Sequence, residues 1–230
     1  MVGRDSRDKR RDGIPRSSAL GLVAALVVTV AVAGCARVPG VYVVEKSGSR
    51  TGAQDGAFDA TAYAAGIWSA KVVPTVLAKA VEAETVLKAV KADPAEAGKK
   101  YGRQTGAGSP YAVMIKGAGK VLSVAKSTGA GQLQVDLNPP DGKADLNIAI
   151  GPVFLGTALR DAVGFIDFGQ FTNQVDYAGA ATALNTEVRQ KVVAPVDLGS
   201  AEGRTVGFAG AFQLLDPKNI VVTPVRLELS

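Results

Sequence analysis

The sequence of 230 residues contains no histidine, one cysteine and two methionines. Without histidine, a Ser–His–Asp triad, a catalytic Cys–His pair and a histidine-ligated metal site are excluded. A single cysteine excludes internal disulfides and cysteine-based zinc sites, and two methionines are too few for a soft-metal site. The composition therefore predicts a protein that works without a cofactor.

Acidic and basic residues are almost balanced once the first 34 residues are set aside. The whole chain has 26 bases and 21 acids, a formal charge of +5. Residues 1–34 hold six of these bases and three of the acids, which leaves 20 bases and 18 acids, or +2, for the rest. A nearly neutral body is not typical of a nucleic-acid-binding protein, so no nucleic-acid partner is expected.

The N-terminal residues have the pattern of a secretion signal. Arg7 to Arg16 form a basic segment, and Ala19 to Ala33 form an apolar run without charge. This run is shorter than the roughly 20 residues that a membrane-spanning helix needs, and its length is typical of a signal peptide. We therefore predict a signal peptide over residues 1–34.

The cysteine follows this apolar run directly. Val32, Ala33, Gly34 and Cys35 together resemble the bacterial lipobox, whose cysteine is acylated on sulfur and becomes the new N-terminus. Small residues let the peptidase approach the backbone, and each buried CH₂ of an acyl chain contributes about 0.8 kcal/mol to anchoring. Cys35 is thus the predicted lipidation site. A structural cysteine at the end of an uncleaved anchor is the alternative.

The sequence then changes from linker to helix. Residues 35–57 are predicted to form the anchor and a flexible polar linker, and residues 58–102 a helical unit. In this unit, Asp59 is a predicted helix N-cap, Trp68 a predicted core residue, and Pro74 the start of a second helix. That second helix has one apolar face, formed by Val76, Ala80, Ala83, Leu87 and Val90.

Beyond the helical unit, the hydrophobic period becomes that of strands. Alternating residues predict strands at Tyr111–Ile115, Val121–Ala125, Gln132–Asn138, Leu146–Ile150, Thr205–Phe212 and Ile220–Leu229. The glycine-rich Lys116–Lys120 is predicted to be a hairpin turn, because it lacks the Ser or Thr that follows the lysine of a phosphate loop. Residues 157–195 are predicted to be largely helical. Short strands with glycine-marked bends favour a small closed or half-closed barrel.

The block Gly151–Asn185 is the least generic part of the chain. Together with the lipobox, the Phe58–Trp68 helix and the closing "VVTPVRLEL", it resembles the family called domain of unknown function 2291, predicted bacterial periplasmic lipoproteins. The resemblance implies a curled, OB-like β domain with a helical domain, and frequent encoding beside sugar ABC importers. It supplies no catalytic residues, because none are established for the family. The expected fold is therefore α+β: a signal peptide, the helical unit 58–102, and an OB-like β-barrel domain 103–230 that contains the helical segment 157–195.

The same block holds the residues of a candidate binding site. Thr157 is placed to cap a helix whose first-turn N–H groups can hold an anion or a hydroxyl-rich ligand. The other candidates, of residue types that bind sugars through hydrogen bonds and a flat ring face, are Arg160, Asp161, Asn173, Gln174 and Tyr177. In the alternative interpretation, Arg160 and Asp161 form a structural ion pair, while Asn173 and Gln174 satisfy buried backbone groups.

These observations lead us to expect a lipid-anchored, non-enzymatic lipoprotein of the cell envelope, outside the cytoplasm. Its expected role is that of an accessory or binding module of a sugar ABC importer. The expected partners are the membrane, through the lipid, and importer components or a sugar. Two other functions stay open: an envelope glycoside hydrolase that uses Asp161, Asp167 and Asp176, and a purely structural lipoprotein.

Overall fold

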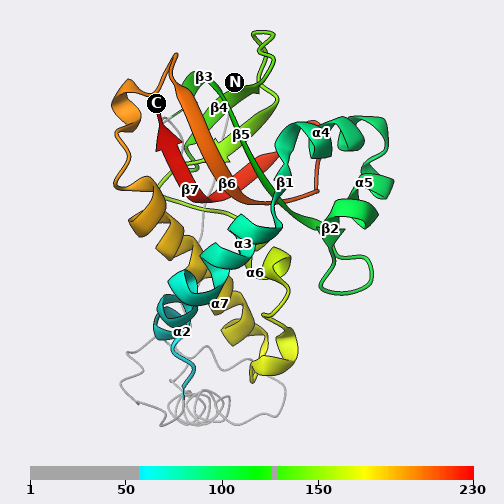
Figure 1. Cartoon of the computed structure of the whole chain (residues 1–230). Helices are drawn as coiled ribbons and strands as arrows, with labels where there is room; N and C mark the ends of the chain where they lie inside the picture. The colour runs from blue at the N-terminus through cyan, green and yellow to red at the C-terminus, as the bar shows by residue number, and fades with distance from the viewer. Residues whose placement is uncertain (1–56, 126–128) are drawn as a thin grey trace, which may run out of the picture. The chain divides into compact units, whose positions relative to one another are not determined.

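The computed structural model describes residues 57–125 and 129–230, which belong to one compact unit, Asp55–Ser230. Figure 1 shows a curled sheet with helices gathered at one end and a helical pair beside it. Among these residues, no helix is both long and apolar enough to cross a membrane. The predicted signal peptide, the lipobox and Cys35 lie outside the described residues.

Five of the seven strands of the sheet form its curled part, and each of them pairs with two others of the five. They are β3 (Ala112–Ala125), β4 (Gln132–Leu137), β5 (Leu146–Ala149), β6 (Thr205–Gln213) and β7 (Val221–Leu229). They pair in the order β3–β4–β5–β7–β6, and β6 also pairs antiparallel with β3 along its whole length. The β5–β7 pairing is parallel and short, with Asn147 opposite Val221 and Ile148 opposite Val222. The sheet is therefore strongly curled but only narrowly joined at β5–β7, which makes it less than a complete barrel.

Strand β3 runs straight through the segment that was predicted to be a hairpin turn. The prediction of a turn at Lys116–Lys120 is wrong, because these residues pair with β6 throughout. The glycines serve close packing instead. A Cβ atom at Gly119 would overlap the carbonyl oxygen of Asp136 and would lie 2.7 Å from Val135 Cγ1 on β4. The two strands predicted around this segment are thus one strand of 14 residues.

Helices precede the sheet and are inserted between β5 and β6. They are α2 (Ala60–Ile67), α3 (Val73–Lys79), α4 (Ala83–Ala92), α5 (Pro94–Tyr101), α6 (Ala158–Val163) and α7 (Gln174–Glu187). The π-helical turns η2 (Trp68–Val72) and η4 (Val188–Val193) continue α2 and α7. Two 3₁₀-helical turns, η3 (Phe168–Gln170) and η5 (Leu198–Ser200), lie in the connections. The predicted N-cap is confirmed, since Asp59 Oδ1 accepts a hydrogen bond of 2.9 Å from the Ala62 backbone N–H.

The helix predicted from Pro74 to Val90 is two helices. Its backbone becomes extended at Ala80, and Val81–Glu82 forms the short strand β1, which pairs parallel with β3. The helical spacing of apolar residues continues across this break because both helices face the same core. The sequence pattern therefore predicted the buried face correctly but missed the break.

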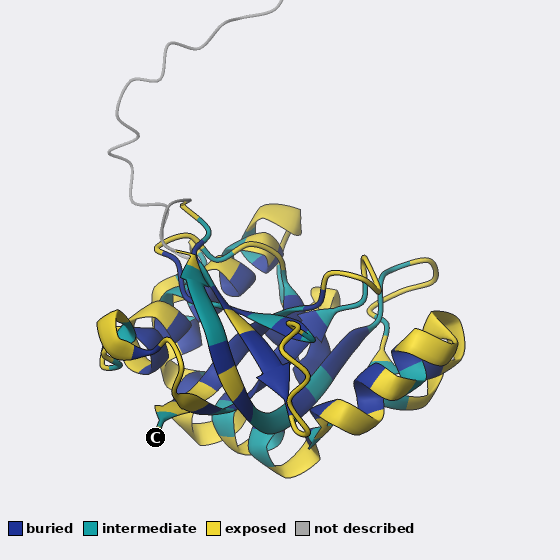
Figure 2. Ribbon diagram, turned by 90° about the horizontal axis from the view of Figure 1, so that it is seen from above, coloured by how far each residue is buried: buried dark blue, intermediate teal, exposed yellow. Residues whose placement is uncertain are grey.

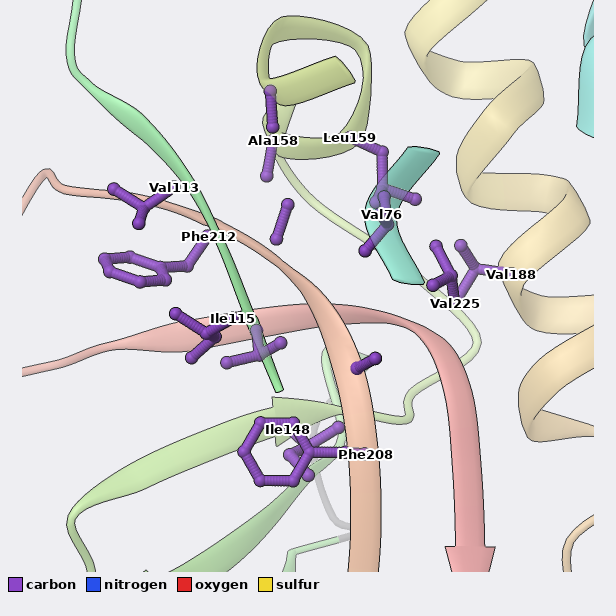
Figure 3. Close-up of a cluster of buried hydrophobic side chains, with 14 of the residues drawn as sticks. Val76, Val113, Ile115, Ile148, Ala158, Leu159, Val188, Phe208, Phe212 and Val225 are labelled. Atoms are coloured by element: carbon purple, nitrogen blue, oxygen red, sulfur yellow. The ribbon is translucent and has the colours of Figure 1, made fainter. Parts of the chain in front are cut away.

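Helices and sheet share one hydrophobic core. Figure 3 shows Val76 of α3, Leu159 of α6 and Val188 of η4 in the same buried cluster as Phe208 and Phe212 of β6. All five side chains are 1% exposed or less. Trp68 is 3% exposed, which confirms the prediction that it is a core residue. In Figure 2, buried residues run through the sheet and the inner faces of the helices, while the outer helix faces are exposed.

The predicted helical unit and the predicted barrel domain are joined within this compact unit. Strands β1 and β2 (Gly102–Arg103) both pair with β3, and α2 packs against α7. The ranges 58–102 and 103–230 therefore share their core. The segment predicted to be helical, 157–195, contains α6, η3, α7 and η4, as expected.

Candidate binding site

Arg160 and Asp161, neighbours on α6, form a buried ion pair. Arg160 Nη2 and Nε lie 2.7 and 2.8 Å from Asp161 Oδ1, and both side chains are more than nine-tenths buried. Arg160 Nη1 also donates a hydrogen bond of 3.2 Å to the backbone carbonyl of Tyr177, and the guanidinium lies 3.6 Å from the centre of the Tyr177 ring. Taking a charged pair out of water is costly, so these extra partners are what make its burial tolerable.

Thr157 and Gln213 complete the hydrogen bonding of Asp161. Thr157 Oγ1 donates to Asp161 Oδ2 at 2.5 Å, and Gln213 Nε2 donates to the same carboxylate oxygen at 3.0 Å. Thr157 occupies the predicted N-cap position of α6, where its backbone carbonyl accepts a hydrogen bond of 3.0 Å from the Asp161 N–H, but its side chain makes no capping hydrogen bond. Gln213, at the end of β6, was not predicted, because its partners are more than 50 residues away in the sequence.

Tyr177 connects this polar network to a cluster of aromatic rings. Its ring centre is 5.3 Å from that of Phe171 and 5.6 Å from that of Phe168. Phe171 lies in turn 5.1 Å from Phe58, near the start of the described residues. Burial raises the pKa of the Tyr177 phenol above its usual range, while the Arg160 guanidinium opposes the shift.

Asn173 and Gln174 do not take part in the network. Asn173 caps α7: its Oδ1 accepts a hydrogen bond of 2.9 Å from the Asp176 backbone N–H. Gln174 follows as the first helical residue and is exposed. The residue that satisfies backbone carbonyl groups in this region is Asn185 rather than Asn173 or Gln174. Asn185 Nδ2 donates a hydrogen bond of 3.1 Å to the Gly156 carbonyl oxygen. Of the six predicted residues, the structure brings together Thr157, Arg160, Asp161 and Tyr177.

The carboxylate of Asp161 is fully engaged by its neighbours among the described residues. Both oxygens of Asp161 already accept hydrogen bonds from Arg160, Thr157 and Gln213. Asp167 and Asp176, the other carboxylates considered for glycoside hydrolysis, bond separately to Arg103 and Asn173. Within residues 57–125 and 129–230, no group of three or more acidic or cysteine side chains can hold a metal ion. The geometry of the network suits it to holding α6, α7 and β6 together.

An open pocket of about 270 Å³ lies beside the network, and Gln213 belongs to both. We call it the sheet-end pocket. Its lining comes from the loop before β4, the end of β5 with the segment after it, α6, and the β6–β7 connection: Ala130, Gly131, Gln132, Ala149, Val153, Leu155, Gly156, Ala158, Gln213, Leu215, Asp216, Asn219, Val221 and Thr223. These segments are far apart in the sequence and meet only because the sheet curls.

The rim of the sheet-end pocket is unusually apolar. Val153, Leu155 and Leu215 are 50%, 73% and 74% exposed. They are three of the five large hydrophobic side chains that are exposed among the described residues. Exposed apolar side chains that cluster around a concavity, rather than being scattered singly, mark a surface that another molecule covers.

The chain belongs to a family of predicted periplasmic lipoproteins. Residues 25–228 match the model of the predicted periplasmic lipoproteins called domain of unknown function 2291. It is thus a lipoprotein of the cell envelope, located outside the cytoplasm, and the predicted family and location are confirmed. No curated protein matches the chain. A crystal structure of an OB-fold protein from Thermotoga maritima superposes with a TM-score of 0.59 and 22% identity, covering 76% of this chain and all of that one. This likeness confirms the OB-like fold.

Proposed function

We propose that this lipoprotein is a non-enzymatic binding module, held at the membrane by acyl chains on Cys35, that assists a sugar ABC importer. The observation that carries the binding role is the sheet-end pocket with its exposed aliphatic rim. A binding role fits better than catalysis, because the buried carboxylate next to the pocket is fully engaged by its own protein partners. The importer as partner is supported by the resemblance of the sequence to a family often encoded beside such importers.

The number of residues between the predicted lipid site and the folded unit allows such a partnership. Cys35 and Phe58 are separated by 22 residues, which can span at most roughly 75 Å when fully extended. A module on a tether of this length can reach a permease in the same membrane or a solute-binding protein docked on it. Tethering also raises the effective concentration of the module near such partners, so a weak contact suffices.

The test is purification from membranes with the lipid retained. We expect the full chain, tagged at its C-terminus, to fractionate with membranes and to co-purify with the subunits of a sugar importer after mild crosslinking. Cys35→Ser serves as the matched control, because it removes the acylated sulfur while leaving the folded unit unchanged. If Cys35→Ser loses membrane association, the lipid anchor is supported. If the wild-type eluate then contains no importer subunit, the importer role is refuted.

A further inference from the structure

We propose that the sheet-end pocket binds a small uncharged polyol, an aliphatic molecule with several hydroxyl groups and about the size of one sugar ring. This inference rests on the proposed binding function and names the ligand class of that site. It follows from the size of the pocket, from the absence of basic side chains in its lining, and from the kinds of polar group that face it. The predicted network residues Arg160 and Asp161 are not part of it.

The pocket has room for a ligand of this size. Its volume of about 270 Å³ corresponds to roughly nine water molecules at 30 Å³ each. That is slightly below the range of about 300–1,000 Å³ typical of sites for drug-sized ligands. The pocket therefore suits a compact molecule such as a single ring, and it is too small to enclose an oligosaccharide or a nucleotide.

The lining selects against negative charge. No lysine or arginine lines the pocket, and its one ionisable residue is the acid Asp216. Phosphates and carboxylates are bound most strongly by arginine and lysine, so without these side chains an anion would lose its water for little compensation here. A cation is also poorly served, because Asp216 is exposed and its Oδ1 already accepts a hydrogen bond of 2.8 Å from the Lys218 backbone N–H.

The remaining polar groups match hydroxyls. The side chains of Gln132 and Thr223 form no hydrogen bond within the part of the chain that the structure describes, although Thr223 is only 4% exposed. Asn219 uses its Oδ1 to accept from Asn147 Nδ2 at 3.0 Å, which leaves its own N–H₂ group available. Amides and hydroxyls both donate and accept, and so do the hydroxyls of a polyol. The Thr223 hydroxyl forms no bond to another described residue, so a polyol in the pocket can replace the water that reaches it.

The apolar part of the lining matches the C–H surface of such a molecule. Alanine and valine side chains form it, with Val153, Leu155 and Leu215 at the rim, and no aromatic ring lines the pocket. A flat aromatic ligand would find no ring to stack on, whereas an aliphatic ring can pack against methyl groups over its whole surface. Covering the three rim side chains removes their exposed area from water, which favours binding by about 25 cal/mol per Å².

The walls of the pocket are fixed before any ligand arrives. Gly131 and Gly151 cross so closely that a Cβ atom at Gly151 would overlap the Gly131 backbone nitrogen. The backbone N–H of Ile150 donates to the Gly131 carbonyl at 2.8 Å, which joins the loop before β4 to the end of β5. On the opposite wall, the network of Asp161 holds Gln213 in place. A site that is already formed loses little ordering entropy when it binds, so even a small ligand can bind measurably.

The experiment uses the full mature lipoprotein in detergent micelles, with methyl groups of valine and leucine isotopically labelled. We titrate it with D-ribose, D-glucose and myo-inositol, and separately with ribose 5-phosphate, glucose 6-phosphate and glucuronate. At least one neutral polyol is expected to shift the methyl signals of Val153, Leu155 and Leu215 in a saturable way. The matched anions are expected to bind at least tenfold more weakly, because the pocket offers them no base.

Variants locate the site. Thr223→Val removes one hydroxyl at similar shape and should weaken binding about two- to tenfold, the value of one hydrogen bond. Leu155→Ser should weaken it severalfold, whereas Val175→Ser should change affinity less than twofold. Val175 is the matched control, because it is equally apolar and 78% exposed but lies on α7 outside the pocket.

Three results would overturn the inference. Equal binding of the anionic and neutral sugars would refute the ligand class, and saturable shifts that avoid the three rim residues would refute the site. If none of the neutral polyols binds, the polyol proposal is wrong. The proposed function is judged separately by membrane co-purification, so an importer complex without polyol binding would leave that function standing.

Discussion

Removing the Asp161 carboxylate tests whether its network holds the fold together. Asp161→Ala leaves the buried Arg160 guanidinium without its anion, and breaking a buried pair from one side costs about 3–5 kcal/mol of unfolding free energy. Asp161→Asn keeps the shape and one strong acceptor, so we expect a smaller loss of about 1–3 kcal/mol. Replacing both residues together, Arg160→Met with Asp161→Leu, should cost less than Asp161→Ala because no unpaired charge stays buried.

Urea unfolding of the mature chain gives these values directly. Trp68 is the single tryptophan of the chain and is 3% exposed, so its fluorescence reports on the core. A shift of the unfolding midpoint at constant slope measures the change in stability. Asp167→Ala is the matched control: Asp167 also bonds to an arginine, Arg103, at 2.9 Å, but the two side chains are 60% and 42% exposed. An exposed pair of this kind contributes about 0–1 kcal/mol.

The comparison can fail in two ways. If Asp161→Ala and Asp167→Ala shift the midpoint equally, burial adds nothing to the importance of the Arg160–Asp161 pair. If the double variant is as unstable as Asp161→Ala, the loss comes from packing rather than from an unpaired charge. Either result would refute the assignment of this network as the electrostatic support of α6.

Three further predictions concern other parts of the fold. Gly119→Ala should lower the free energy of unfolding by about 1–3 kcal/mol, because the added Cβ overlaps β4. Gly207→Ala is the control and should not show this loss, since nothing lies within 4 Å of its added Cβ. Equal effects of the two variants in urea unfolding would contradict the close-packing role of Gly119. Asp59→Ala should lose about 1 kcal/mol with its N-cap, and an unchanged midpoint would argue against the cap. Burial raises the pKa of Tyr177 above its unfolded value of about 10, so its stabilising contribution is present below that pH and is lost as the pH rises through the folded pKa. An ultraviolet titration of the phenols should therefore show a late component that Tyr177→Phe removes, and a component that persists in the variant would contradict the assignment.

Elements with a strong local signal could be predicted from the sequence. The cap at Asp59, the burial of Trp68 and the strands β6 and β7 all follow from patterns within a few residues. The long strand β3 could not, because glycine is disfavoured in isolated strands and the reason for Gly119 lies on β4, a separate segment. The local preference of glycine predicted a turn, whereas Gly119 is needed because β4 packs against it too closely for a side chain.

The site shows the same limit. Arg160 and Asp161 could be singled out from the sequence, because their side chains are of types that bind sugars or form ion pairs. Their partner Gln213 and the lining of the sheet-end pocket come from strands and connections that only the curled sheet brings together. No periodicity in one segment can indicate that Leu155 and Leu215 will be neighbours on a rim.

The pairing of β3 with β6 has a consequence for the timing of folding. Ala112 stands opposite Gln213, so about a hundred residues of chain must be available before the two ends of the sheet can meet. Structures dominated by such distant pairings form slowly. We therefore expect the sheet to stay open in a growing or translocating chain until β6 has emerged. Such a delay would keep the chain unfolded while it is exported. Closure of the sheet would then depend on its C-terminal strands rather than on its first ones.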